Sequence, residues 1–261
     1  MTRRLPALLL LLIAFQAVGQ SAGRELLRST NPNRTTPLWV PFDLAFAPTG
    51  QLSEKLFDVY ALRDLREFGE RSRMRAHSGP HAATARTCFG ERPAEIPARV
   101  VTVAELASSS RTIFSGRIAD RTMGFFEDAP AALLTVDVER QIKRSPEFRL
   151  SDGKLLLHYP DASFSVGDVD YCIQPATHAA RPRVGDRVLV FAIQVPVDPS
   201  GRLVYTQASK HLVFETAAGE LLVPDHLRQE VTSRGIKTLD QFLQHLVSCE
   251  EEKGKHRPAV K

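Results

Sequence analysis

The chain has 261 residues, of which 43% are hydrophobic and 25% are charged, a composition typical of globular proteins. That length accommodates one or two domains, which excludes a large multidomain assembly, a disordered tail and a multi-spanning membrane protein. The formal net charge is only +4 and the basic residues are interspersed with Asp and Glu, so no basic face for nucleic acid is expected.

Residues 1–23 are predicted to be a signal peptide. Arg3 and Arg4 form a positive start, an apolar stretch follows over 5–18, and small residues around Gly19 and Gly23 offer cleavage sites. The apolar stretch is shorter than the roughly 20 residues that span a bilayer, so cleavage and export are favoured over a stable membrane span. We therefore expect a secreted or periplasmic mature protein, with a net charge of 4 − 2 = +2.

Residues 24–97 are predicted to lie outside the main domain. The segment Leu38–Phe42 is expected to pack back onto the body, although its surroundings are rich in Pro, Thr and Asn. Apolar residues at helical spacing predict an amphipathic helix over 53–74, with Ser53 as its N-cap. Residues 76–97 contain mostly His, Gly, Pro, Ala and Thr and are predicted to be a linker.

The main domain is predicted to begin at residue 98 and to consist of short strands with one early helix. Thr102-Val103-Ala104-Glu105 matches a capping box, which predicts a brief helix ending near Ser109. A strand is predicted over 112–119, where Gly116 indicates a bulge or a tight bend. The alternation of apolar and polar residues over 133–143 predicts a strand with one buried and one solvated face.

The later part of the main domain is also predicted to be mostly strands. Residues 187–195 are apolar on both faces and should form the most buried strand. The preceding Val184-Gly185-Asp186 is read as a turn in which Gly adopts a positive φ, and Asp198-Pro199-Ser200-Gly201 as a hairpin turn. Further strands are predicted at 154–159, 170–173, 203–207, 212–214 and 220–223.

The domain is predicted to end in a helix. Thr238-Leu239-Asp240-Gln241 is a second capping box, and an apolar stripe continues to about Cys249. The charged residues 250–261 are predicted to be a frayed tail. The fold expected for 98–249 is mainly β, a small five- to six-stranded Greek-key barrel with a C-terminal helix and an N-terminal helical segment; a β-sandwich is the alternative.

Two segments resemble the netrin-like domains, the OB-fold barrels that also occur in tissue inhibitors of metalloproteinases and in short bacterial secreted proteins. Glu105–Ile118 is similar to the helix and following strand of that family. Val184–Ala192 is similar to its Gly-x-x-Tyr-Leu-Val-x-Ala strand, with Val188 in place of the Tyr. The resemblance covers about half of the chain, from Cys88 to Phe214.

The resemblance implies a disulfide between Cys88 and Cys172, because family members often bridge cysteines at these two positions. Such a bridge would stabilise the fold by roughly 4 kcal/mol in the chain-entropy model. The third cysteine, Cys249, would remain as a thiol. Inhibitors of this family coordinate the protease zinc through a cysteine at the mature N-terminus, whereas Cys88 is internal.

No motif predicts a metal ion or another cofactor. His77 and His81 have the spacing of a helical metal pair, but Gly79 and Pro80 between them prevent a helix. Asp168 and Asp170 could offer two oxygens to Ca²⁺ without the remaining ligands of a loop site. Ser115 lacks the surroundings of a nucleophile elbow, and no phosphate-binding loop is present.

Four residues could be assembled into an acid–base site, namely His158, His211, Asp137 and Glu139, but no motif connects them. The leading hypothesis is therefore an exported non-enzymatic binding or structural protein whose unknown partner is a protein or peptide. The alternative is a secreted hydrolase or protease inhibitor with a site not visible in sequence. Clustering of the four residues around a pocket would favour the enzyme, and a flat apolar patch would favour the binder.

Overall fold

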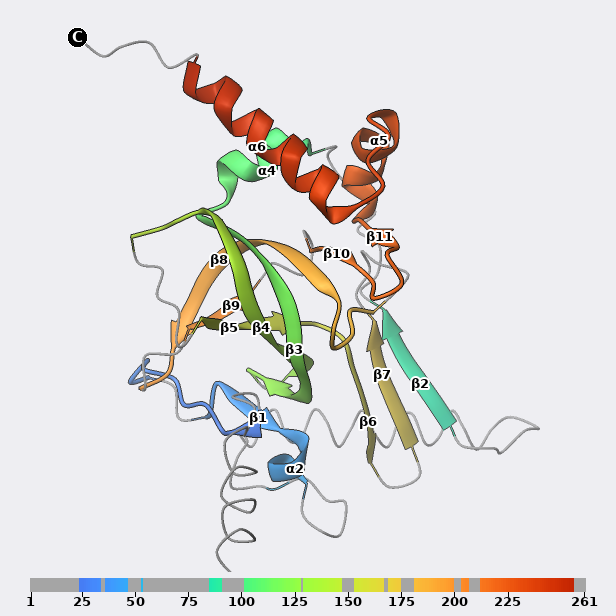
Figure 1. Cartoon of the computed structure of the whole chain (residues 1–261). Coiled ribbons are helices and arrows are strands. Elements are labelled where there is room, and N and C mark those ends of the chain that lie inside the picture. Colours follow the sequence, from blue (N-terminus) through green and yellow to red (C-terminus); the bar gives the residue numbers. More distant parts are fainter. Residues whose placement is uncertain are drawn as a thin grey trace, which may run out of the picture.

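The computed structural model describes residues 24–33, 36–46, 53, 85–90, 101–127, 129–146, 153–166, 169–174, 181–199, 203–206 and 212–255. The large majority of the ordered elements are strands, so the expectation of a mainly β protein is confirmed. Figure 1 shows a large sheet with α4, α5 and α6 at one end, β1 and α2 at the other, and a smaller sheet beside it.

The elements are β1 (Trp39–Pro41), α2 (Phe42–Ala45), β2 (Ala85–Gly90), α4 (Val103–Ser109), β3 (Thr112–Phe126), β4 (Ala129–Lys143), β5 (Lys154–Tyr159), β6 (Ala162–Val166), β7 (Val169–Gln174), β8 (Arg187–Val197), β9 (Leu203–Thr206), β10 (Val213–Glu215), β11 (Leu221–Leu222), α5 (Asp225–Ser233) and α6 (Leu239–Lys255). The large sheet has eight strands in the order β1-β3-β4-β5-β9-β8-β10-β11, and β3 also pairs with β8. It is a mixed sheet, because β5 and β9 run parallel whereas the other pairs are antiparallel.

The hairpin of β3 and β4 is the longest feature of this sheet and is longer than the predicted strands. Its register shifts between Ser115 and Gly116, which confirms the bulge expected at the glycine. A Cβ on Gly116 would overlap the carbonyl oxygen of Asp137 and lie 2.9 Å from a methyl carbon of Val136. Only glycine therefore allows β3 and β4 to approach this closely.

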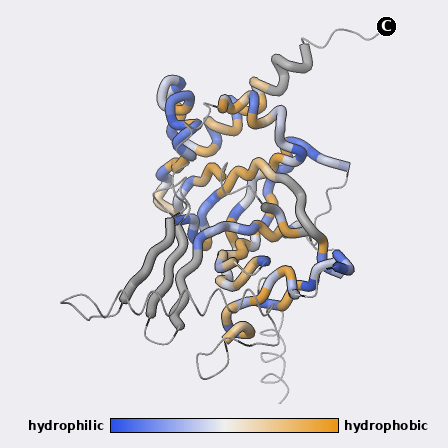
Figure 2. The backbone as a smooth tube through the Cα atoms, turned by 180° about the vertical axis from the view of Figure 1, so that it is seen from behind, coloured by the Kyte–Doolittle hydropathy of each residue, from blue (hydrophilic) through white to orange (hydrophobic). Residues whose placement is uncertain are grey.

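The main core lies on one face of the large sheet, and alternate residues of each strand supply it. On β8, for example, Val188 and Val190 belong to this core, whereas Leu189 and Phe191 face the opposite side. All residues from Val188 to Ala192 are buried, as expected for a strand that is apolar on both faces. Figure 2 shows hydrophobic residues along the strands of this sheet.

Helices cover the opposite face at the end formed by β3, β8 and β10. Their apolar residues Leu106, Leu227 and Phe242 pack in one cluster with Phe191 of β8. Thr102 and Glu105 form the predicted capping box at the start of α4. At the start of α6, the Gln241 amide donates to Thr238 Oγ1 and the Thr238 amide donates to Gln241 Oε1. Both predicted helix starts are therefore confirmed.

The N-terminal segment covers the same face at the other end of the sheet. Trp39 is fully buried with Leu133 of β4, and β1 pairs with the end of β3, which confirms that this segment packs back. One position differs from the alternation predicted over 133–143: Thr135 is a polar residue expected on the solvated face of that strand, but it is only 3% exposed. The apolar–polar alternation along β4 therefore predicts a solvated face only at positions that no other part of the chain covers.

The smaller sheet has the order β2-β7-β6, with β2 parallel to β7. A linker was predicted over 76–97. This prediction is wrong for residues 85–90, which form β2. The short run Thr87-Cys88-Phe89 between polar and glycine-rich residues is too brief to show a strand period.

The C-terminal region differs from expectation in its extent. The helix α6 continues to Lys255, whereas a frayed tail was predicted from residue 250, and α5 was not predicted. The amphipathic helix predicted over 53–74 lies outside the described residues, apart from Ser53, whose amide donates to the Ala45 carbonyl at 2.7 Å. Across the described ranges, no helix has the length and apolar character needed to cross a membrane.

Candidate functional site

His158 lies on the face of β5 that the N-terminal segment covers. Its ring stacks on Phe126 with 4.5 Å between the ring centroids and 30° between the planes. Its register partner, Leu133, belongs to the core cluster beneath that segment. Burial lowers the pKa of His158 from 6.5 to about 4, so the imidazole is neutral at pH 7. The side chain is partly exposed and packs against an aromatic ring, which is the environment of a packing residue.

Asp137 and Glu139 lie further along β4 and form surface ion pairs. Asp137 Oδ1 is 3.7 Å from Lys154 Nζ, and Glu139 Oε1 is 3.6 Å from Arg117 Nε, with about half of each side chain exposed. Asp137 is four residues along β4 from the register partner of His158, a span of about 13 Å. The structure therefore does not bring His158 together with either carboxylate.

The other predicted candidates add no second site. His211, His77, His81 and Asp168 lie outside the described residues, and only the backbone is described for Asp170, Cys88 and Cys172. Ser115 is a buried residue of β3. Among the side chains that the structure describes, no group of three His, Cys, Asp or Glu residues converges to hold a metal ion.

A buried ion cluster stands where β5 ends. The Asp161 carboxylate is fully buried; Arg121 Nη2 donates to its Oδ2 at 2.6 Å and Arg181 Nε lies 3.1 Å from its Oδ1. Burial raises the pKa of Asp161, and the two guanidinium groups act in the opposite direction. Burial and the Asp161 charge also raise the pKa of Tyr159. Asp161 Oδ2 accepts a hydrogen bond, whereas the buried Oδ1 has the Arg181 ion pair but no hydrogen bond, and this burial between two guanidinium groups fits a structural role.

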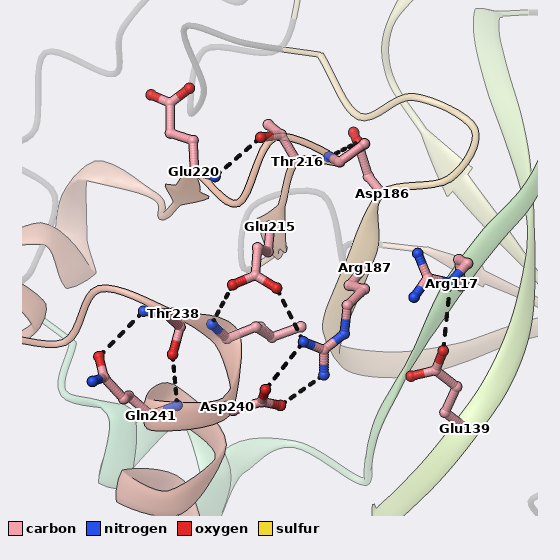
Figure 3. A network of polar contacts seen from close by, with 12 residues as sticks. Arg117, Glu139, Asp186, Arg187, Glu215, Thr216, Glu220, Thr238, Asp240 and Gln241 are labelled. Atoms are coloured by element: carbon pink, nitrogen blue, oxygen red, sulfur yellow. Dashed lines mark hydrogen bonds and ion pairs between the residues drawn. The ribbon is translucent and has the colours of Figure 1, made fainter.

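A second polar network connects the sheet to the start of α6 (Figure 3). Arg187 donates to Glu215 Oε2 at 3.0 Å and to Asp240 Oδ1 at 2.7 Å. Glu215 Oε1 accepts the amide of Leu239, the first residue of α6. The Arg187 hydrogen bond holds the pKa of Asp240 below its usual value. These ion pairs and hydrogen bonds hold the start of α6 against the sheet, so the charged groups have a structural role.

An apolar surface is present at α2, close to the N-terminal strand. Leu44 is 47% exposed, and the half-buried rings of Phe42 and Phe46 lie 5.7 Å apart in the same helix and its C-cap. The ring of Phe42 also packs edge-on against buried Phe125 at 5.1 Å. An exposed leucine in the same helix as a packed aromatic ring is a candidate contact for a protein partner.

A thiol, an imidazole and a carboxylate lie close together between α5 and α6. Cys249 Sγ is 3.8 Å from His245 Nδ1 and also 3.8 Å from its Nε2, while His245 Nε2 is 2.7 Å from Glu230 Oε1. The sequence interpretation considered Cys249 alone and missed His245. The signal was the spacing of four residues on a predicted helix, which places two side chains on one face.

Comparisons with known proteins assign no family to this arrangement. No protein-family model matches the sequence, and no curated protein matches it significantly.

Proposed function

We propose that the protein is an exported, non-enzymatic binding or structural protein whose partner is a protein or peptide. The observation that carries this proposal is the separation of the candidate acid–base residues: His158 is a neutral packing residue, and Asp137 and Glu139 are engaged by surface cations. General acid–base catalysis requires such groups within hydrogen-bond reach of one substrate. The apolar surface at α2 favours binding over a secreted hydrolase.

The proposed scaffold is a small barrel of the netrin-like, OB-fold kind. The pairings β3–β4, β4–β5, β5–β9, β9–β8 and β8–β3 return to the strand from which they start, and this succession supports the proposal. The core that these five strands share is the main core of the large sheet. The two segments that resemble the family supply parts of this barrel. The start of β3 lies in Glu105–Ile118, and the start of β8 lies in Val184–Ala192.

Export is supported by the charged and apolar residues at the start of the chain, which match a cleavable signal peptide. Expression of the full chain in a secreting host, with N-terminal sequencing of the exported product, tests this directly. We expect a mature N-terminus between residues 20 and 24. Retention of the uncleaved chain in the membrane fraction would contradict the prediction.

We also propose the disulfide between Cys88 and Cys172 that the resemblance implies. The backbone register supports it, because Cys88 of β2 is the direct partner of Cys172 of β7. Neighbouring strands are about 4.8 Å apart, within the Cα separation that disulfides span, and paired residues share a face of the sheet. The bridge would join β2, an edge strand of the smaller sheet, to β7 at its centre.

Peptide mapping of the unreduced protein tests the bridge. We expect a linked peptide pair containing Cys88 and Cys172, and alkylation of Cys249 without prior reduction. A linkage between Cys88 and Cys249, or alkylation of all three cysteines, would contradict it.

The binding function is tested with a photocrosslinking residue at position 44. Val184 provides a matched control because it is an exposed hydrophobic residue, 57% accessible, in a turn of another part of the chain. We expect the exported protein to form a discrete adduct with a protein or peptide from position 44 and none from position 184. Equal labelling at both positions, or none at either, would count against the apolar surface at α2 as the binding face.

A further inference from the structure

The ion cluster at the end of β5 combines one negative group with two positive groups. The Asp161 carboxylate lies 2.6 Å from Nη2 of Arg121, which belongs to β3, and 3.1 Å from Nε of Arg181. The Asp161 side chain is fully buried, and the two arginine side chains are 18% and 32% exposed. The three groups sum to one positive charge in a place with little water, where a net charge is costly unless an ion of opposite sign joins it.

Two hydrogen-bond donors in this cluster have no acceptor among the residues that the structure describes. The Tyr159 side chain is fully buried in the main core, and its hydroxyl makes no hydrogen bond there. The Nε–H group of Arg121 is also buried without an acceptor, because this side chain donates to Asp161 through Nη2. Buried polar groups in folded proteins are nearly always satisfied by protein, water or an ion. Two orphaned donors beside a net positive charge therefore indicate an acceptor that the chain itself does not supply.

The Tyr159 hydroxyl is part of the cluster electrostatically. Burial and the negative charge of Asp161 raise the pKa of this hydroxyl, and the positive charges of Arg121 and Arg181 act in the opposite direction. The backbone also joins the two residues, because the Asp161 amide donates to the Tyr159 carbonyl at 2.7 Å. Tyr205 provides the contrast: it is a buried tyrosine of the same core, and burial alone raises its pKa.

We propose that this cluster binds a small monovalent anion, of the size of chloride, through the Tyr159 hydroxyl and Arg121 Nε. Such an ion accepts both hydrogen bonds and neutralises the positive charge, whereas a water molecule accepts the hydrogen bonds and leaves the charge. The full burial of Tyr159 and Asp161 limits the size of the ion, and the partly exposed Arg181 side chain gives it a way in. The inference is independent of the proposed binding function.

The experiment measures urea unfolding of the exported protein while sodium chloride is exchanged for sodium gluconate at constant ionic strength. Constant ionic strength keeps the screening of surface charges the same, and gluconate is too large for a buried site. Tyr159→Phe removes only the hydroxyl that is proposed to hold the ion. Tyr205→Phe is the matched control, because it removes a buried hydroxyl from the same core outside the cluster.

We expect an increase in chloride from about 10 mM to about 300 mM to lower the unfolding equilibrium constant about tenfold, as for a site with a dissociation constant of about 20 mM. Tyr205→Phe should keep this dependence on chloride, and Tyr159→Phe should lose most of it. Crystals of the unmodified chain soaked in sodium bromide locate the ion directly. We expect an anomalous peak beside the Tyr159 hydroxyl and Arg121 Nε.

Identical unfolding of the unmodified chain in the two salts would overturn the proposal. An equal chloride response in folded Tyr159→Phe and the unmodified chain would also overturn it, because the ion would then bind elsewhere. If Tyr159→Phe does not fold, the bromide measurement decides the question. The absence of an anomalous peak at the cluster, or an ordered water in its place, would reject the anion site.

Discussion

Acidification is expected to destabilise the protein through the partly buried imidazole of His158. The unfolded chain binds the proton at a pKa of 6.5, whereas burial against Phe126 lowers the folded value to about 4. The folded-state pKa is depressed, so this contribution to stability is present above pH 6.5 and is lost as the pH falls toward 4. The two values give a loss of about 2 kcal/mol between pH 7 and pH 5, and about 3 kcal/mol by pH 4.

The perturbation is His158→Gln, which removes the titrating group. The free energy of unfolding is measured by urea denaturation at pH 7, 6 and 5 for the variant and the unmodified chain, with circular dichroism as the signal. The difference between the two chains isolates His158. Other groups shift as well, because burial lowers the pKa of His226 and raises that of Asp161, but these effects are common to both chains and cancel.

The expected result is that His158→Gln loses about 2 kcal/mol less than the unmodified chain between pH 7 and pH 5. His158→Leu should show the same weaker dependence of the unfolding free energy on pH, because both variants lack the titrating imidazole. Its stability at pH 7 need not equal that of His158→Gln. Parallel pH profiles for all three chains would refute the assignment of His158 as a partly buried neutral imidazole.

Three further substitutions test the packing and the polar contacts, each by urea denaturation. Gly124→Ala should cost about 1–3 kcal/mol and shift Trp39 fluorescence to the red, because a Cβ there would lie 2.8 Å from the Trp39 ring; unchanged emission would contradict this packing. Arg187→Gln should cost about 1–3 kcal/mol by leaving a largely buried carboxylate without its partner, whereas Asp240→Asn, at a 66% exposed side chain, should cost less than about 1 kcal/mol. The reverse order would contradict the network. Thr102→Ala should cost about 1 kcal/mol through loss of the capping box at α4, and an unchanged stability would count against that cap.

Features that depend on neighbours in sequence were predictable. The capping boxes at Thr102 and Thr238 place their hydrogen-bonding partners three residues away, so both helix starts could be read directly. The turn at Gly185 has the predicted positive φ, 93°, and the strand over 154–159 has the predicted bounds. Each of these features is determined by a few adjacent side chains.

Features that depend on distant segments were not predictable in the same way. Thr135 has the polar position of an alternating strand but is buried, and its register partner Leu156 packs in the same cluster as Trp39 of the N-terminal segment. The parallel pairing of β2 with β7 places Cys88 opposite Cys172, and the proximity of these two residues was implied by the family resemblance and not by any local pattern. The bulge at Gly116 was visible as a glycine within a strand, but the close approach of Asp137 that requires it came from β4.

The group formed by Glu230, His245 and Cys249 combines both kinds of information. The spacing of His245 and Cys249 follows from helix geometry alone, so the sequence predicts that these two side chains share a face of α6. Glu230 belongs to a helix that was not predicted, and its contact with the imidazole depends on how α4, α5 and α6 pack together. A histidine–cysteine pair read from sequence therefore indicates that the two side chains are close, whereas the carboxylate from α5, 2.7 Å from Nε2, fixes the orientation of the imidazole ring.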